Sequence, residues 1–326
     1  MEKKKNDFIA QGSILAIASI LVRVMGMIYR IPMTAIIGDK GNGFYSYAYS
    51  VYTILLLLSS YSLPLAVSKM VSAKAQLGQW RNVKRVFICA IAFAIGIGTT
   101  FGLIVLIGAQ FFTRVFFHSE LAAIALRFMA PTILIMALLG VFRGFFQGLQ
   151  NTLPTAVSQI VEGLINAIMS VVFAYFLFDF GHGMDAAGGT TDLGYAWGAA
   201  GGAIGTGAGA LAGLIFCFIL FVAYRKILAV NISRDKTGTQ QEYGDIFRLM
   251  LSIALPVILS TALYNLIELV DGSLFNNIMA SKGMEDVKDS MWGEETVLQK
   301  KAVTVLARSE GMAAVSGLNT QDAEAR

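Results

Sequence analysis

Two arginines stand within an apolar segment that is long enough to cross a lipid bilayer. Residues 19–38 read SILVRVMGMIYRIPMTAIIG and contain Arg23 and Arg30. A guanidinium near the centre of a bilayer costs about 2.5–3.5 kcal/mol on insertion scales, so lipid is an unfavourable surrounding for either side chain. Their separation is about two helical turns, so both side chains share one helix face, about 10 Å apart along the axis. The pattern predicts that both face a common anionic group, and their planar forks match phosphate oxygens.

A second segment carries polar side chains on one helix face. Gln159, Glu162 and Asn166 fall within about 80° of one another on a helical wheel. Carboxylates inside membranes are rare, and they face either a partner charge or a hydrated cavity. Two interpretations therefore stay open for Glu162. It forms an ion pair with Arg23 or Arg143 that holds the helices together, or it lies in a water-filled cavity that receives a substrate. The same face also includes Thr155 and Ser170.

The last apolar segment has a polar face of its own, which consists of Thr261, Tyr264, Asn265, Glu268 and Asp271. The hypothesis that unites these observations is a central hydrated cavity, lined by the arginine face and by the two polar faces. The candidate substrate-binding residues are Arg23, Arg30, Gln159, Glu162, Asn166 and Asn265.

Three tyrosines follow one another at helical spacing in the segment YSYAYSVY. Tyr45, Tyr49 and Tyr52 stand at positions i, i+4 and i+7. Because the stripe begins at the end of an apolar segment, we favour an interfacial aromatic belt at the outer leaflet. The alternative is a surface on which a sugar ring stacks.

The composition indicates that these faces belong to a polytopic α-helical membrane protein. Of the 326 residues 56% are hydrophobic and only 14% are charged, well below the roughly 25% charged residues of soluble domains. A bilayer span requires about 20 apolar residues. Such runs recur near residues 9–29, 46–67, 86–112, 121–142, 155–178, 195–223 and 250–274.

The basic residues of the loops predict an orientation. Lys and Arg gather at the N-terminus, in the loop after the second segment and in the loop after the sixth, whereas the loop DFGHGMDAAGGTTDLG has neither. The positive-inside rule therefore places the N-terminus in the cytoplasm of a multi-pass cell-membrane protein. The net charge of +4 follows this topology and does not indicate nucleic-acid binding.

The sixth segment is rich in glycine and reads WGAAGGAIGTGAGALAG. Gly201, Gly205 and Gly209 stand four residues apart, a spacing that lets helix backbones approach closely in lipid. A dinucleotide-binding fingerprint requires a preceding strand, which this context lacks. We therefore expect close helix packing here and no cofactor.

No constellation for catalysis is visible. The sequence has no Gly-rich loop ending in Gly-Lys-Ser/Thr and no metalloprotease motif. His118 and His182 stand far apart, without a Cys or carboxylate cluster that would suggest a metal site. We expect a protein that is not an enzyme and binds no metal.

Three stretches resemble the oligosaccharide flippase branch of the multidrug/oligosaccharidyl-lipid/polysaccharide exporter superfamily, near the stage V sporulation protein B type and the lipid II flippases. They are LVRVMGMIYRIPMTAIIG, GVFRGFFQGLQNTLPTAVSQIVEGLINAI and ALPVILSTALYNLIELVDGSLFNN. The most specific feature is the run F-R-G-x-x-Q-G-x-x-N-x-x-P-T from Phe142 to Thr155. In this family an arginine pair of the first helix faces a cationic cavity, and Arg23 and Arg30 match it.

The resemblance implies an all-α fold of two helical lobes, of which this chain matches the N-terminal half. It also implies alternating-access transport of undecaprenyl-diphosphate-linked saccharides, such as a peptidoglycan precursor or a polysaccharide repeat unit. The expected partners are this lipid-linked oligosaccharide and membrane lipid. For coupling to an ion gradient the candidates are Glu162, Glu268 and Asp271.

Family members have about fourteen helices, and this chain has room for seven. The expected units are an N-terminal lobe (1–230), a cytoplasmic basic linker (231–249), a seventh helix that starts the second lobe (250–280) and a polar tail (281–326). We read the tail as poorly ordered or marginally helical, and favour its being out of frame after about Met291. A half that dimerises and an inactive fragment are the alternatives.

Two other functions compete with the flippase. The first is a cation-coupled drug exporter of the same superfamily, which the paired arginines disfavour because like charges repel. The second is a membrane scaffold that transports nothing, in which the polar faces would be helix–helix contacts.

Overall fold

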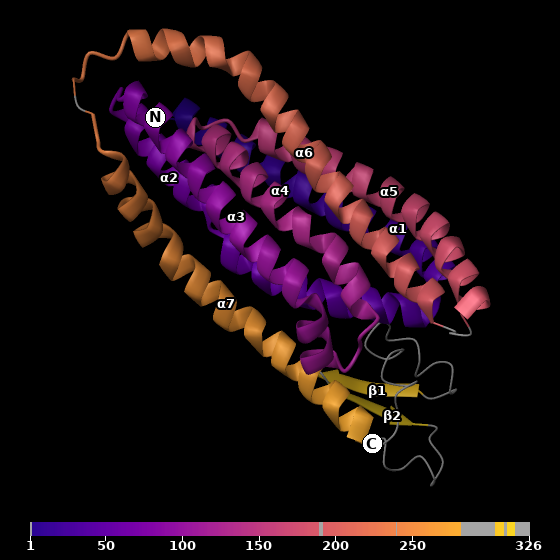
Figure 1. The fold of residues 1–326 in the computed structure, drawn as a ribbon. Coiled ribbons are helices and arrows are strands. Elements are labelled where there is room, and N and C mark those ends of the chain that lie inside the picture. The colour runs from indigo at the N-terminus through magenta and orange to yellow at the C-terminus, as the bar shows by residue number, and fades with distance from the viewer. Residues whose placement is uncertain (1, 189–191, 239, 282–303, 310–311, 317–326) are drawn as a thin grey trace.

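The protein is a bundle of long helices in the computed structural model, which describes residues 2–188, 192–238, 240–281, 304–309 and 312–316 (Figure 1). The side chains of residues 2–11 and of most residues from 262 onward lie outside the described part. The helical elements are α1 (Glu2–Leu56), the π-turn η1 (Leu57–Tyr61), α2 (Leu63–Gln76), α3 (Trp80–Phe117), α4 (Ala122–Gly148), α5 (Leu153–Gly188), α6 (Leu193–Ser233) and α7 (Tyr243–Ser281).

Six stretches of the described residues are long and apolar enough to cross a membrane. The first of them, Gly12–Gln76, has 65 residues. At about 1.5 Å per residue it would be about three times as long as the hydrocarbon core is thick, so it cannot be one straight crossing. The backbone leaves the helical conformation at Gly38, with φ 65° and ψ −177°, and the chain turns back there (Figure 1).

Packing contacts confirm this reversal. Before Gly38 the chain runs beside α5, where Val22 and Met25 pack against Gly163. After Gly38 it runs beside α4, where Val71 packs against Gly148. The two legs of this hairpin account for the first two of the seven apolar segments expected from the sequence.

The connections lie at two ends of the bundle. The loops after α2, α4 and α6 meet at one end, which we call the basic end because it carries Lys74, Arg81 and Arg234. The turn at Gly38 and the loops after α3 and α5 lie at the other end (Figure 1). Buried cores occupy both ends, one around Tyr47 and Phe117, whose rings stack at 4.8 Å. The other includes Phe87, whose ring centroid lies 4.5 Å from that of Phe221.

Glycines set the closest helix pair, α5 with α6. A Cβ added at Gly201 would overlap the backbone of Phe173 and Ala174, and one added at Gly205 would overlap the backbone of Ser170. One added at Gly209 would come within 2.6 Å of the Glu162 carbonyl oxygen. The close packing predicted from the four-residue glycine spacing is confirmed.

The linker between α6 and α7 is attached to the first turns of α3. The backbone N–H of Arg81 donates to Asp235 Oδ2 at 2.9 Å, and the backbone N–H of Gln241 donates to Asn82 Oδ1 at 3.0 Å. Arg85 donates to the carbonyl oxygen of Gln241 at 2.5 Å, and its guanidinium lies over the Tyr243 ring, 5.1 Å from the centroid. We call this set of contacts the linker clamp.

The described part of the tail differs from the sequence expectation. Instead of helix, strands β1 (Thr304–Ser309) and β2 (Met312–Ser316) form an antiparallel pair. The β-branched residues Thr304, Val305 and Val315 favour this conformation.

Replacing Gly205 by alanine should push α5 and α6 apart, because the added methyl group meets the backbone of Ser170 as well as its hydroxyl. We expect a loss of about 2 kcal/mol or more, as for overpacked cores, measured as a lower apparent melting temperature in detergent. The matched control is Gly96→Ala, where nothing lies within 4 Å of the added Cβ. Equal melting temperatures for the two variants would contradict the close-packing argument.

The linker clamp predicts a pH dependence. The backbone N–H of Arg81 and then the hydroxyl and N–H of Thr237 hold the pKa of Asp235 down, to about 2. A depressed pKa contributes stability above the ordinary value near 3.8, which is lost as the pH falls through the folded-state value. Asp235→Asn should therefore melt below wild type at pH 7, and the gap should shrink between about pH 4 and pH 2. The exposed Asp179→Asn serves as the control, and a gap that stays constant with pH would count against the clamp.

Candidate functional site

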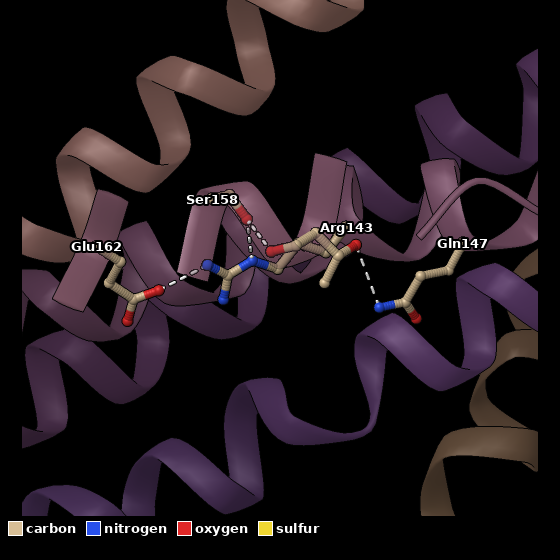
Figure 2. A network of polar contacts seen from close by, with 5 residues as sticks. Arg143, Gln147, Ser158 and Glu162 are labelled. Atoms are coloured by element: carbon tan, nitrogen blue, oxygen red, sulfur yellow. Dashed lines mark hydrogen bonds and ion pairs between the residues drawn. The ribbon is translucent and has the colours of Figure 1, made fainter. Parts of the chain in front are cut away.

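The polar face of α5 is joined to α4 by a network centred on Arg143 (Figure 2). Arg143 Nη2 lies 2.7 Å from Glu162 Oε2, and Arg143 Nε donates to Ser158 Oγ at 2.8 Å. Ser158 Oγ in turn donates to the carbonyl oxygen of Thr155 at 2.8 Å. Gln147 Nε2 donates to Thr155 Oγ1 at 3.3 Å. Apart from the Ser158–Thr155 bond within α5, these contacts join the last two turns of α4 to the first turns of α5.

The local sequence explains why these residues meet. The chain turns back between α4 and α5 through Gln150, whose φ is 59°, and Asn151 Oδ1 accepts the backbone N–H of Leu153 at the start of α5. Gly144 and Gly148 lie against the backbone of α2, where an added Cβ would come within 2.7 Å of the Pro64 carbonyl oxygen and within 2.8 Å of that of Ser68. The Phe142–Thr155 run thus encodes both the turn and the network.

Charge inside the bundle is balanced at this point. The side chains of Arg143 and Glu162 are 11% and 25% exposed, so neither is well hydrated by bulk water. A buried charge is tolerated when it is paired and hydrogen-bonded. Of the two partners considered for Glu162, Arg143 is confirmed and Arg23 is not. Ser158 was missed from the sequence, although its position four residues before Glu162 places it on the same helix face.

The rest of the α5 face is partly occupied by α6. Ser170 is fully buried, and its hydroxyl oxygen lies 2.8 Å from Asn166 Oδ1 and 3.3 Å from the Gly202 carbonyl oxygen. Gln159 Oε1 is buried and has no hydrogen-bond partner among the described residues. The part of this face around Asn166 and Ser170 is thus a contact between α5 and α6. Gln159 Oε1, in contrast, is an acceptor without a partner among the described residues.

Arg23 and Arg30 lie on the first leg of α1, and both side chains are exposed. The helix is continuous between them, so they share a face as expected. In the part of the chain that the structure describes, neither guanidinium makes an ion pair or a hydrogen bond. Arg30 lies close enough to Tyr45 and Tyr49 of the second leg to interact with them electrostatically.

The tyrosine stripe is mostly buried. Tyr45 is 7% exposed and Tyr52 is 2% exposed, and the Tyr45 hydroxyl lies 3.3 Å from Thr206 Oγ1 on α6. The expectation of an aromatic belt facing lipid is therefore wrong for these two residues. They face inward because the α1 hairpin packs its second leg against α6. Tyr49, at 45% exposed, is the open member of the stripe.

The structure does not bring the polar face of α7 to that of α5. Asn265, Glu268 and Asp271 belong to α7, but their side chains lie outside the described part. Among the described residues α7 contacts α3, α2, η1 and α1 but not α5, and it runs along the opposite flank of the bundle (Figure 1).

Comparisons with known proteins agree with this architecture. The profile of the Polysaccharide biosynthesis protein family matches residues 8–285. The chain is 25% identical over 303 residues to the Lipid II flippase MurJ of Bacillus subtilis, covering 90% of this chain and 53% of that protein. It is 26% identical over 266 residues to Stage V sporulation protein B of the same organism, covering 80% and 48%. The chain thus spans about half the length of these curated relatives.

A solved MOP superfamily transporter from Pyrococcus furiosus shares the fold. It superposes with a TM-score of 0.56 at 15% identity, over 89% of this chain and 58% of that one. The all-α membrane bundle expected from the sequence is confirmed.

Glu162→Gln should leave the Arg143 guanidinium without its anion inside the bundle. We expect a loss of about 3 kcal/mol, the low end for a broken buried pair because Glu162 is partly exposed. The double variant Arg143→Met/Glu162→Leu removes both charges and should recover most of that loss. Apparent melting temperatures in detergent check both, and additive losses would show that the two groups do not interact.

Proposed function

We propose that this chain, which belongs to the Polysaccharide biosynthesis protein family, serves to move an undecaprenyl-diphosphate-linked saccharide across the cell membrane. The saccharide would be a peptidoglycan precursor or a polysaccharide repeat unit. The similar Bacillus subtilis proteins, one named a lipid II flippase and one a sporulation protein, support a role in cell-wall or spore-envelope synthesis.

The observation that carries this proposal is the pair Arg23 and Arg30. Both are exposed on an apolar helix, and no described residue neutralises them. Arg143 shows that this bundle pairs a guanidinium where the charge serves packing. Two unpaired guanidiniums about 10 Å apart are suited to the two phosphates of a lipid diphosphate, which they bind through charge-assisted, bidentate hydrogen bonds.

Alternating access requires a second wall opposite this arginine face. The described bundle provides one wall, and the matched relatives are about twice as long. We infer that further helices complete the cavity, supplied either by a second lobe or by a second copy of this chain. The polyprenyl tail stays in lipid while the polar head crosses, since only the head needs to be shielded from hydrocarbon.

Orientation and energy supply are further parts of the proposal. We infer from the positive-inside rule that the basic end faces the cytoplasm, because it carries Lys74, Arg81 and Arg234. For ion coupling we retain Glu162, Glu268 and Asp271. Glu162 would take part only when its contact with Arg143 opens, because that contact satisfies one of its oxygens.

Loss of both arginines should strongly weaken binding of the diphosphate. We expect Arg23→Ala/Arg30→Ala to bind undecaprenyl diphosphate at least about 100-fold more weakly, since each charged hydrogen bond contributes about 1.5–3 kcal/mol. Binding is measured by native mass spectrometry in nanodiscs, and flipping of the saccharide-linked lipid in vesicles gives a second readout.

Arg114→Ala is the matched control, because Arg114 is also an exposed arginine but pairs with Glu120 at 3.6 Å. It should bind like wild type. Wild-type affinity in the Arg23/Arg30 double variant would refute the proposed anion site.

A further inference from the structure

Tyr49 is the open member of an otherwise buried aromatic stack. Its ring centroid lies 5.8 Å from that of Tyr45, with the planes 19° apart, and 5.9 Å from that of Tyr52. The two neighbours are buried, whereas Tyr49 is 45% exposed. The two neighbouring rings hold the Tyr49 side chain in place, and almost half of the residue stays exposed.

The α1 hairpin brings this ring to the arginine face. Arg30 stands eight residues before Gly38 and Tyr49 stands eleven residues after it. At about 1.5 Å per residue the two lie about 12 and 16 Å from the turn, at nearly the same depth. Arg30 and Glu162 both lie close enough to Tyr49 to interact with its hydroxyl electrostatically.

This surrounding does not match a lipid contact. A tyrosine at the membrane interface is flanked by lipid, whereas the protein neighbours of Tyr49 are Tyr29, Arg30, Glu162 and the buried Tyr45 and Tyr52. A partly exposed aromatic ring near charged groups suits a ligand with apolar C–H faces and polar edges. A pyranose ring has these properties, since its C–H groups meet the negative face of the ring and its hydroxyls meet the charged groups.

We propose that Tyr49 is the contact for the first sugar of the lipid-linked saccharide, an assignment that rests on the proposed function. The first sugar is bonded directly to the diphosphate, so it must lie beside whichever arginine binds the outer phosphate. The position of Tyr49 next to Arg30 makes Arg30 that residue and Arg23 the one nearer the lipid tail.

The test compares two probes in nanodiscs that contain the full chain. One is undecaprenyl diphosphate, and the other is undecaprenyl diphosphate carrying a disaccharide. Wild type should bind the glycosylated probe more tightly. Tyr49→Ala should lower that affinity about threefold to tenfold, as expected for an aromatic contact, and leave the affinity for bare diphosphate unchanged. Tyr49→Phe keeps the ring and should retain most of the preference for sugar.

Tyr175→Ala is the control, because Tyr175 is 60% exposed on α5 and should not change either affinity. Unchanged binding of the glycosylated probe by Tyr49→Ala overturns the sugar contact while leaving the diphosphate proposal intact. Equal weakening for both probes also overturns it, because Tyr49 would then act on the fold or on the diphosphate. Failure of wild type to bind either probe overturns the proposed function and the sugar contact together.

Discussion

The structure depends on one constraint, which is the free-energy cost of placing a guanidinium inside a lipid bilayer. Arg143 meets it inside the bundle, where Glu162 and Ser158 accept its hydrogen bonds and the chain is neutral locally. Arg23 and Arg30 do not meet it with any described residue. The arginines of the bundle thus differ in their surroundings: Arg143 has a partner, whereas Arg23 and Arg30 have none among the described residues. The contrast between paired Arg143 and the exposed Arg23 and Arg30 is what the proposed anion site rests on.

The arginine face lies on a hairpin that packs against the glycine-rich contact of α5 with α6. Because α5 and α6 approach at Gly201, Gly205 and Gly209, the two helices form a tight pair that holds the α1 hairpin on one side. The second leg of the hairpin contacts α6 through Tyr45 and Thr206, and the first leg contacts α5 at Gly163. Arg23, Arg30 and Tyr49 thus lie on a hairpin whose two legs pack against α5 and α6. Rigid presentation favours binding, since less conformational entropy is lost when a ligand docks.

Much of this arrangement can be predicted from the sequence. The features that could not be predicted depend on tertiary packing. Hydropathy gives the apolar segments and spacing gives the shared face of Arg23 and Arg30, because both properties are local. The choice of Arg143 over Arg23 as the partner of Glu162 depends on how α4 turns into α5, which is tertiary. The inward direction of Tyr45 likewise depends on where the hairpin packs. The flank taken by α7 depends on its linker, whose polar residues carry no periodic signal.

That linker has a mechanical consequence. Hydrogen bonds of Asp235, Asn82 and Arg85 join the linker to α3. The start of α7 is therefore held close to α3. A movement of the C-terminal part of α7 is therefore transmitted to α3 unless α7 itself bends. The backbone ladder of α7 is interrupted at Pro256, about 20 Å beyond the root at Tyr243. A proline removes one backbone hydrogen bond of the helix, so α7 bends more readily at Pro256 than at its clamped start.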